Sequence, residues 1–122
     1  MSEDIERIVK LREKFGKKFI IRIDANQGYD TAKTIEFYNK TKHLDVELIE
    51  QPLSAKAVEE MRKLPDPIRK IIAADESLLT PKSALALVKP PLAAGIFNIK
   101  LMKCGGISQG IKNCRHRFAR RR

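Results

Sequence analysis

The sequence lacks the cysteine content, the long apolar runs and the basic start that are typical of secreted or membrane-spanning proteins. Its 122 residues include no Trp and only two Cys, Cys104 and Cys114. Two cysteines are too few for a disulfide framework or a paired zinc motif, so we expect a reducing, cytoplasmic setting. No apolar run approaches the roughly 18 residues that a membrane span needs. The acidic start over residues 1–4 also lacks the basic region of a secretory signal. A membrane partner is therefore not expected.

Positive charge is concentrated in a C-terminal tail, residues 112–122. The whole chain has a formal net charge of +10, but this tail holds six basic side chains and no acidic one. The remaining body, residues 1–111, has a net charge of only +4, which is ordinary for a protein surface. The tail has one aromatic residue, Phe118, and so lacks the interleaved rings that stack on bases. We interpret it as non-native, out-of-frame or disordered sequence, and nucleic-acid binding is the least favoured function.

The body alternates between helical and strand-like patterns. Amphipathic helices are predicted over residues 3–15, 31–42, 54–64 and 81–88, and short apolar strands over 19–23, 46–49, 71–74 and 96–100. A further helix is expected after the glycine pair at 105–106. Strands that alternate with helices predict an α/β fold in which parallel strands are joined by right-handed crossovers.

A charged residue closes each predicted strand, at intervals of 25 or 26 residues. These residues are Asp24, Glu50, Asp75 and Lys100. A constant period indicates repeated (β/α) units. A TIM-type barrel is favoured over a doubly wound sheet, because only in a barrel do successive strand ends converge on one central point. A complete barrel takes at least about 200 residues, so the body corresponds to about half of one.

The three acids among these residues form a candidate metal site. Carboxylates at neighbouring strand ends repel one another unless a hard cation lies between them. Ligation by oxygen atoms alone favours Mg²⁺, with Mn²⁺ as a plausible substitute. The alternative is that Asp24, Glu50 and Asp75 are ordinary strand-end acids paired with nearby Lys or Arg. Their shared position at consecutive strand ends favours the metal site.

Lys100 is the candidate general base. A lysine near a metal and partly removed from water has a lowered pKa, and can then accept a proton near neutral pH. Lys103 is a competitor that lies beyond the predicted strand end. Asn26 and Asn98 share strand parity with Asp24 and Lys100, respectively, and could support the site or contact substrate. A loop-capping role for Asn26 is equally open.

Four segments also resemble a known family. They are IRIDANQGY at 21–29, IEQP at 49–52, ADES at 74–77 and NIKLMKCGGI at 98–107. Together they resemble the muconate lactonizing enzyme subgroup of the enolase superfamily, and within it most the dipeptide epimerases. The resemblance covers residues 1 to about 111.

The resemblance implies a fold, a metal and a reaction. It implies that the body comprises barrel strands three to six, that Asp24, Glu50 and Asp75 bind Mg²⁺, and that Lys100 is one of two acid/base lysines. In such enzymes a lysine removes the proton alpha to a carboxylate, through an enediolate that the metal stabilises. The implied substrates are small carboxylates such as dipeptides or N-acyl amino acids, and the implied activity is that of an epimerase or cycloisomerase.

Other parts of that family have no counterpart here. They are the capping domain, strands one and two with the second lysine, and strands seven and eight. We therefore expect this chain itself to be weakly active or inactive. One alternative is a catalytically inactive, metal-binding half barrel that self-associates. Whether or not the chain is active, we expect a homodimer that pairs the sixth-strand edge of each copy with the third-strand edge of the other, which would close an eight-stranded barrel and bring the partner's Lys100 just before Asp24.

Overall fold

Four short parallel strands form the centre of the molecule. The computed structural model describes residues 2–118. The strands are β1 (Ile21–Asp24), β2 (Val46–Glu50), β3 (Ile72–Ala74) and β4 (Ile96–Phe97), and they pair in the order β1-β2-β3-β4. Every neighbouring pair is parallel. This consecutive order confirms the predicted (β/α) repeat and is that of a barrel segment, since a doubly wound sheet would reverse its order.

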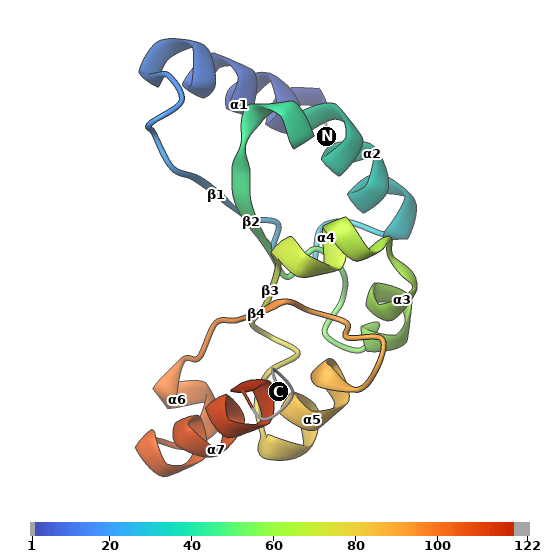
Figure 1. The fold of residues 1–122 in the computed structure, drawn as a ribbon, viewed down its shortest axis with the longest axis vertical. Helices are drawn as coiled ribbons and strands as arrows, with labels where there is room; N and C mark the ends of the chain where they lie inside the picture. The colour runs from blue at the N-terminus through green and yellow to red at the C-terminus, as the bar shows by residue number, and fades with distance from the viewer. Residues whose placement is uncertain (1, 119–122) are drawn as a thin grey trace.

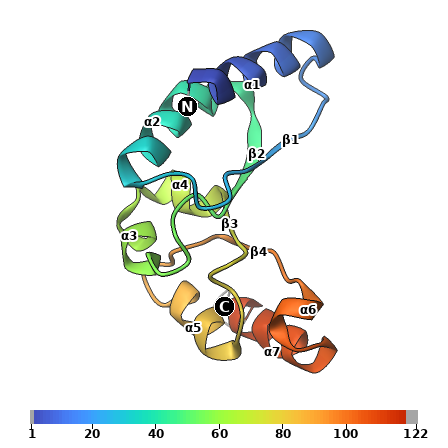
Figure 2. The same cartoon turned by 180° about the vertical axis from the view of Figure 1, so that it is seen from behind.

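Helices precede, connect and follow the strands. They are α1 (Ser2–Phe15), α2 (Thr31–Thr41), the 3-10 helix η1 (Lys42–Leu44), α3 (Val58–Lys63), α4 (Asp66–Ile71), α5 (Pro81–Val88), α6 (Leu101–Cys104) and α7 (Ile107–Phe118). The ribbon curves as an arc, with α2, α3, α4 and α5 along one side of it and the strands along the other (Figures 1 and 2). No helix in the described part of the chain is long and apolar enough to cross a membrane.

Local signals explain where several helices begin. Asp30 accepts a hydrogen bond from the backbone N–H of Lys33 at 2.7 Å and so caps α2. Thr80 and Ser83 form a capping box at the start of α5, and Pro81 follows at the first helical position. The caps therefore set the points at which the chain leaves the loops after β1 and β3.

Three elements differ from the sequence prediction. The helix expected over 54–64 begins only at Val58, because residues 54–57 form a turn in which the Ala57 N–H bonds the Ser54 carbonyl at 2.9 Å. A separate helix, α4, starts at the Pro65–Pro67 segment, where no helix was predicted. The fourth strand ends at Phe97 rather than at residue 100, and α6 follows at once.

The core consists of two clusters. One packs α3, α4 and α5 against β3, and its fully buried members include Met61, Ile68, Ile72 and Leu87. The other packs α1 and α2 against β1 and β2 around Phe37. Both clusters bury the apolar side chains of the helices and thereby fix the strand ends that they connect.

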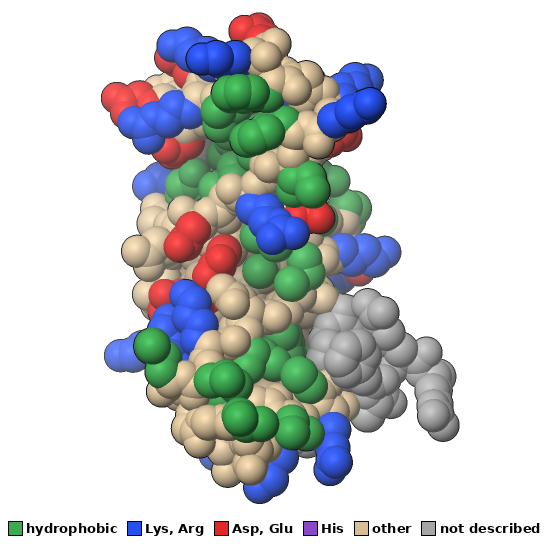
Figure 3. All heavy atoms as spheres, turned by 90° about the vertical axis from the view of Figure 1, so that its left-hand side faces the viewer, with side chains coloured by type: hydrophobic (Ala, Val, Ile, Leu, Met, Phe, Trp, Pro, Cys, Tyr) green, Lys and Arg blue, Asp and Glu red, His purple; other side chains and the backbone are tan. Residues whose placement is uncertain are grey.

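Within residues 2–118, no helix covers the opposite face of the sheet (Figures 1 and 2). It contains a cavity of about 340 Å³ lined by Arg22, Leu48, Glu50, Ala73, Ile96, Phe97 and Asn98. Figure 3 shows acidic side chains near the middle of this side of the molecule, with apolar side chains above and below them. This open face corresponds to the interior of a barrel.

Residues 112–118 continue α7 as a helix. The remaining residues of the expected tail, 119–122, lie outside the described part of the chain. The interpretation of 112–122 as a separate, non-native tail therefore stays a prediction.

Candidate metal and proton-transfer site

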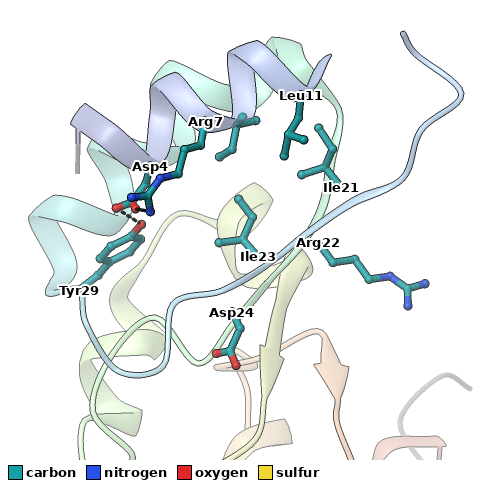
Figure 4. Close-up of a pocket in the computed structure, with 9 residues that line it drawn as sticks. Asp4, Arg7, Leu11, Ile21, Arg22, Ile23, Asp24 and Tyr29 are labelled. Atoms are coloured by element: carbon teal, nitrogen blue, oxygen red, sulfur yellow. Dashed lines mark hydrogen bonds and ion pairs between the residues drawn. The ribbon is translucent and has the colours of Figure 1, made fainter. Parts of the chain in front are cut away.

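The register of the sheet places the three candidate carboxylates at the carboxyl-terminal end of the strands. Asp24 is the Cα partner of Glu50, and Glu50 is the partner of Ala73. Asp75 lies two residues beyond Ala73 and so has the same strand parity. Figure 4 shows Ile21 and Ile23 pointing toward α1 and Asp24 pointing away from it. The carboxylates therefore emerge at the carboxyl ends of three adjacent strands, as the sequence predicts.

Asp24 is the most exposed of the three. Its Oδ1 accepts a hydrogen bond from the backbone N–H of Asn26 at 2.9 Å. Asn26 has a φ of +44° and Gln27 a φ of +64°, so two consecutive residues adopt the left-handed conformation. Asn26 thus supports Asp24 through its backbone, while a role for its side chain stays a prediction.

Glu50 lies between Asp24 and Asp75 and is largely buried. Its side chain is 18% exposed. Its Oε1 accepts a hydrogen bond from Asn98 Nδ2 at 2.7 Å, and Lys100 Nζ lies 3.5 Å from the same oxygen. The structure therefore brings the predicted residue Asn98 into contact with the central carboxylate.

Asp75 is buried and paired with two lysines. Lys100 Nζ donates to its Oδ2, and Lys103 Nζ lies 3.0 Å from both of its carboxylate oxygens. Burial alone would raise the pKa of Asp75, but the hydrogen bonds from Lys100 and then Lys103 outweigh burial and lower it. Asp75 is thus held as a carboxylate. Lys103 reaches it because α6 begins immediately after residue 100.

Lys100 differs from expectation in its electrostatics. We expected its pKa to be lowered, but the hydrogen bond to Asp75 raises it, with a further contribution from the charge of Glu50. The cause is that the ammonium lies directly against the carboxylates and neutralises them. Lys100 can therefore act as a base only where another cation compensates those carboxylates.

Gln51 is a functional candidate that the sequence analysis missed. It is fully buried. Its Oε1 accepts hydrogen bonds from the backbone N–H groups of Asp75 and Ser77 and from the Ser77 hydroxyl. The available signal was an amide side chain directly after Glu50 and directly before a proline, within the segment IEQP at 49–52 that resembles the family.

The chemistry of the donors fits a hard divalent cation. Three carboxylates provide the oxygen ligands that Mg²⁺ and Mn²⁺ prefer. Within residues 2–118, however, the side chains are not gathered into a group of three or more that could hold a metal. Glu50 and Asp75 instead face Lys100 and its neighbours, and Asp24 faces its own loop. The ligand set Asp24, Glu50 and Asp75 therefore stays a prediction.

Comparison with known proteins identifies the family. The family described as "Enolase C-terminal domain-like" matches residues 1–116. The chain is 52% identical over 112 residues to an L-Lys-D/L-Arg epimerase of Desulforapulum autotrophicum, covering 92% of this chain and 31% of that protein. It is 47% identical over 107 residues to an L-Lys-D/L-Arg epimerase of Methylococcus capsulatus, covering 88% and 30%, respectively.

Solved structures agree with this assignment. A dipeptide epimerase from Methylococcus capsulatus in complex with Mg superposes with a TM-score of 0.92 at 42% identity, over 97% of this chain and 34% of that one. A muconate lactonizing enzyme superposes with a TM-score of 0.86 at 28% identity, over 97% and 32%.

The chain spans about a third of the length of these relatives. The family match covers nearly all of its residues, and the strand order is that of a barrel segment. Both observations confirm the resemblance seen in the four sequence segments. The chain therefore belongs to the enolase superfamily, as a portion of its C-terminal, barrel-forming domain.

Proposed function

We propose that this chain carries the metal-binding part of the active site of a Mg²⁺-dependent epimerase. The reaction takes place at the carbon alpha to the carboxylate of a dipeptide. The observation that carries the proposal is the register of the sheet. Asp24 and Glu50 end β1 and β2, Asp75 directly follows β3 with the same parity, and Lys100 lies three residues beyond the end of β4. The curated relatives named as L-Lys-D/L-Arg epimerases support dipeptides with cationic side chains as the substrate class.

Each residue has a distinct role in this proposal. Asp24, Glu50 and Asp75 would hold Mg²⁺, which when bound neutralises negative charge on the substrate carboxylate. Lys100 Nζ would accept the alpha proton from one face of that carbon, and a second acid on the opposite face would deliver a proton to complete the epimerisation. Lys103 can keep Asp75 paired when Lys100 turns toward substrate, because it already contacts both Asp75 oxygens.

Turnover by this chain alone is a separate question from metal binding. The resemblance implies a second lysine and a capping domain, and neither has a counterpart among these 122 residues, so these residues alone do not supply the second proton donor or the exclusion of water that such a domain provides. We therefore propose that the 122-residue chain binds Mg²⁺ and catalyses weak exchange or none.

Calorimetric titration with Mg²⁺ tests the metal site. We expect saturable binding to the wild-type chain, loss of binding in Asp75→Asn, and unchanged binding in Asp66→Asn. Asp66 is a matched control because it lies on α4 and pairs with Lys70 at 2.7 Å, outside the site. The absence of binding in the wild-type chain would contradict the proposed site.

Exchange of the substrate alpha proton with D₂O tests turnover. The probe is L-Lys-L-Arg, followed by proton NMR in the presence of Mg²⁺. Exchange that disappears in Lys100→Ala would mean that the chain is a weak enzyme. Metal binding without exchange would identify it as a catalytically inactive half barrel.

A further inference from the structure

Gln51 occupies an unusual backbone position at the end of β2. Its φ is +36°, in the left-handed region that residues other than glycine seldom adopt. Two backbone hydrogen bonds hold it there: its N–H donates to the Ala73 carbonyl at 2.8 Å, and its carbonyl accepts from Gln27 N–H at 2.7 Å. Gln51 therefore joins the loop after β1 to the strand β3.

The side chain of Gln51 extends this connection to the loop after β3. Its Oε1 lies 3.0 Å from the Asp75 N, 3.1 Å from the Ser77 N and 2.9 Å from the Ser77 Oγ. Its Nε2 donates to the Leu53 carbonyl at 2.9 Å. The orientation of the amide is determined by its neighbours, because backbone N–H groups can only donate and a carbonyl can only accept.

These contacts connect all three strand ends that carry the candidate ligands. The backbone of Gln51 binds the loop after Asp24, its own position follows Glu50, and its side chain binds the backbone of Asp75. A fully buried amide whose oxygen and nitrogen are both hydrogen-bonded is held firmly, since displacing it leaves polar groups unpaired in the interior.

We propose that Gln51 is the positioning residue of the site: it sets the placement of Asp75 relative to Asp24 and Glu50. This inference rests on the proposed function for its metal-binding consequence only. Its structural content, that the Gln51 amide oxygen holds the Asp75–Ser77 turn, is independent of any metal.

The chemistry of this position requires an amide. Methionine has a similar length but no acceptor for Asp75 and Ser77. Glutamate retains the acceptor oxygens but has no donor for the Leu53 carbonyl, and adds a buried negative charge beside Glu50 and Asp75. The two substitutions therefore separate the acceptor from the donor.

Amide hydrogen exchange in the metal-free chain tests the structural part. In Gln51→Met we expect the amides of Asp75 and Ser77 to exchange at least about tenfold faster than in the wild-type chain. In Gln51→Glu, which keeps the acceptor, we expect their protection to persist. Unchanged exchange of these two amides in a folded Gln51→Met would overturn the proposal.

Gln27→Met is the matched control. Gln27 is also a loop glutamine whose Oε1 accepts a backbone N–H, that of Ala55 at 2.9 Å, but it is exposed and does not contact Asp75. In Gln27→Met we expect the amide exchange rates of Asp75 and Ser77 to stay within about twofold of those in the wild-type chain.

Mg²⁺ titration of the same variants tests the positioning role. We expect the affinity to fall at least about tenfold in Gln51→Met and to be unchanged in Gln27→Met. Normal affinity in Gln51→Met would overturn the positioning role. A wild-type chain that does not bind Mg²⁺ would instead overturn the proposed function, and the exchange experiment would still decide whether Gln51 holds the turn.

Discussion

Asp75 shows how burial and charge compete at a single residue. Its carboxylate is almost fully removed from water, which by itself favours the neutral acid. Two lysines from the segment after β4 reverse that preference. The carboxylate therefore stabilises the folded chain only while it is charged, and the stability of the chain should depend on pH.

The sign of this dependence follows from the direction of the shift. The pKa of Asp75 is lowered in the folded chain, so its contribution is fully present above the unfolded value of 3.8 and is lost as pH falls through the folded value. We expect Asp75→Asn to destabilise the chain at pH 7 and to differ less from wild type at pH 3. The measurement is urea unfolding at both pH values in EDTA.

Asp45→Asn is the control for this experiment. Asp45 is exposed and has a φ of +52°, a conformation that asparagine also tolerates. We expect its free energy of unfolding to follow that of the wild-type chain at both pH values. An equal effect of Asp75→Asn at pH 7 and pH 3 would contradict the assigned ion pairs.

At the scale of elements, α7 carries a buried polar side chain at its contact with the rest of the chain. It lies against α5, and Asn113 on it is fully buried. Neither polar atom of the Asn113 side chain has a hydrogen-bond partner within the described residues. Burying an unpaired amide costs free energy, so this position weakens the docking of α7.

Replacing this amide with an apolar side chain of similar size should stabilise the chain. We expect Asn113→Leu to raise the free energy of unfolding by about 1–3 kcal/mol, because the desolvation cost disappears. Urea unfolding measures the change, and Asn39→Leu on the exposed face of α2 should change it by less than about 0.5 kcal/mol. Lower stability of Asn113→Leu would mean that the Asn113 amide has a partner.

At the scale of the whole molecule, both edges of the sheet are open. The outer edges of β1 and β4 have no neighbouring strand within residues 2–118. Ile20, just before β1, is 62% exposed, and a cavity of about 250 Å³ lies between α1 and β1. Open parallel edges next to apolar side chains favour association.

The register is compatible with a barrel made of two copies. Asp24 is in register with Ile96 through Glu50 and Ala73. In an eight-stranded barrel the register shifts by about eight residues in one full circuit, so it shifts by about four across each half. Asp24 of a second copy would therefore lie level with the residue four positions beyond Ile96, which is Lys100. Closure would also bring α7 of one copy beside α1 of the other, so one of these helices must shift.

The molecular mass in solution tests the predicted homodimer. Light scattering of the chain at about 100 μM should give twice the chain mass of 13.9 kDa. We expect Ile20→Asp to weaken the dimer at least about tenfold, and Leu85→Asp, on an exposed position of α5, to leave it unchanged. A monomeric mass would contradict the dimer, and larger species would mean that the edges pair without closing.

Much of this protein could be predicted from local sequence patterns. The alternation of helices and strands depends on short-range periodicity, and so does the charged residue at or just beyond each strand end. The four motif segments also identified the family, because they retain residue types at fixed spacing.

Tertiary structure alone decided how the site is held together. Whether Lys103 reaches Asp75 depends on where β4 ends and α6 begins, and α6 packs against α7. The role of Gln51 depends on burial between two strand ends that are 24 residues apart in the chain. The sequence by itself determined which charged groups stand at the strand ends. The pairing of those groups required the sheet, because contacts between distant residues leave no local pattern.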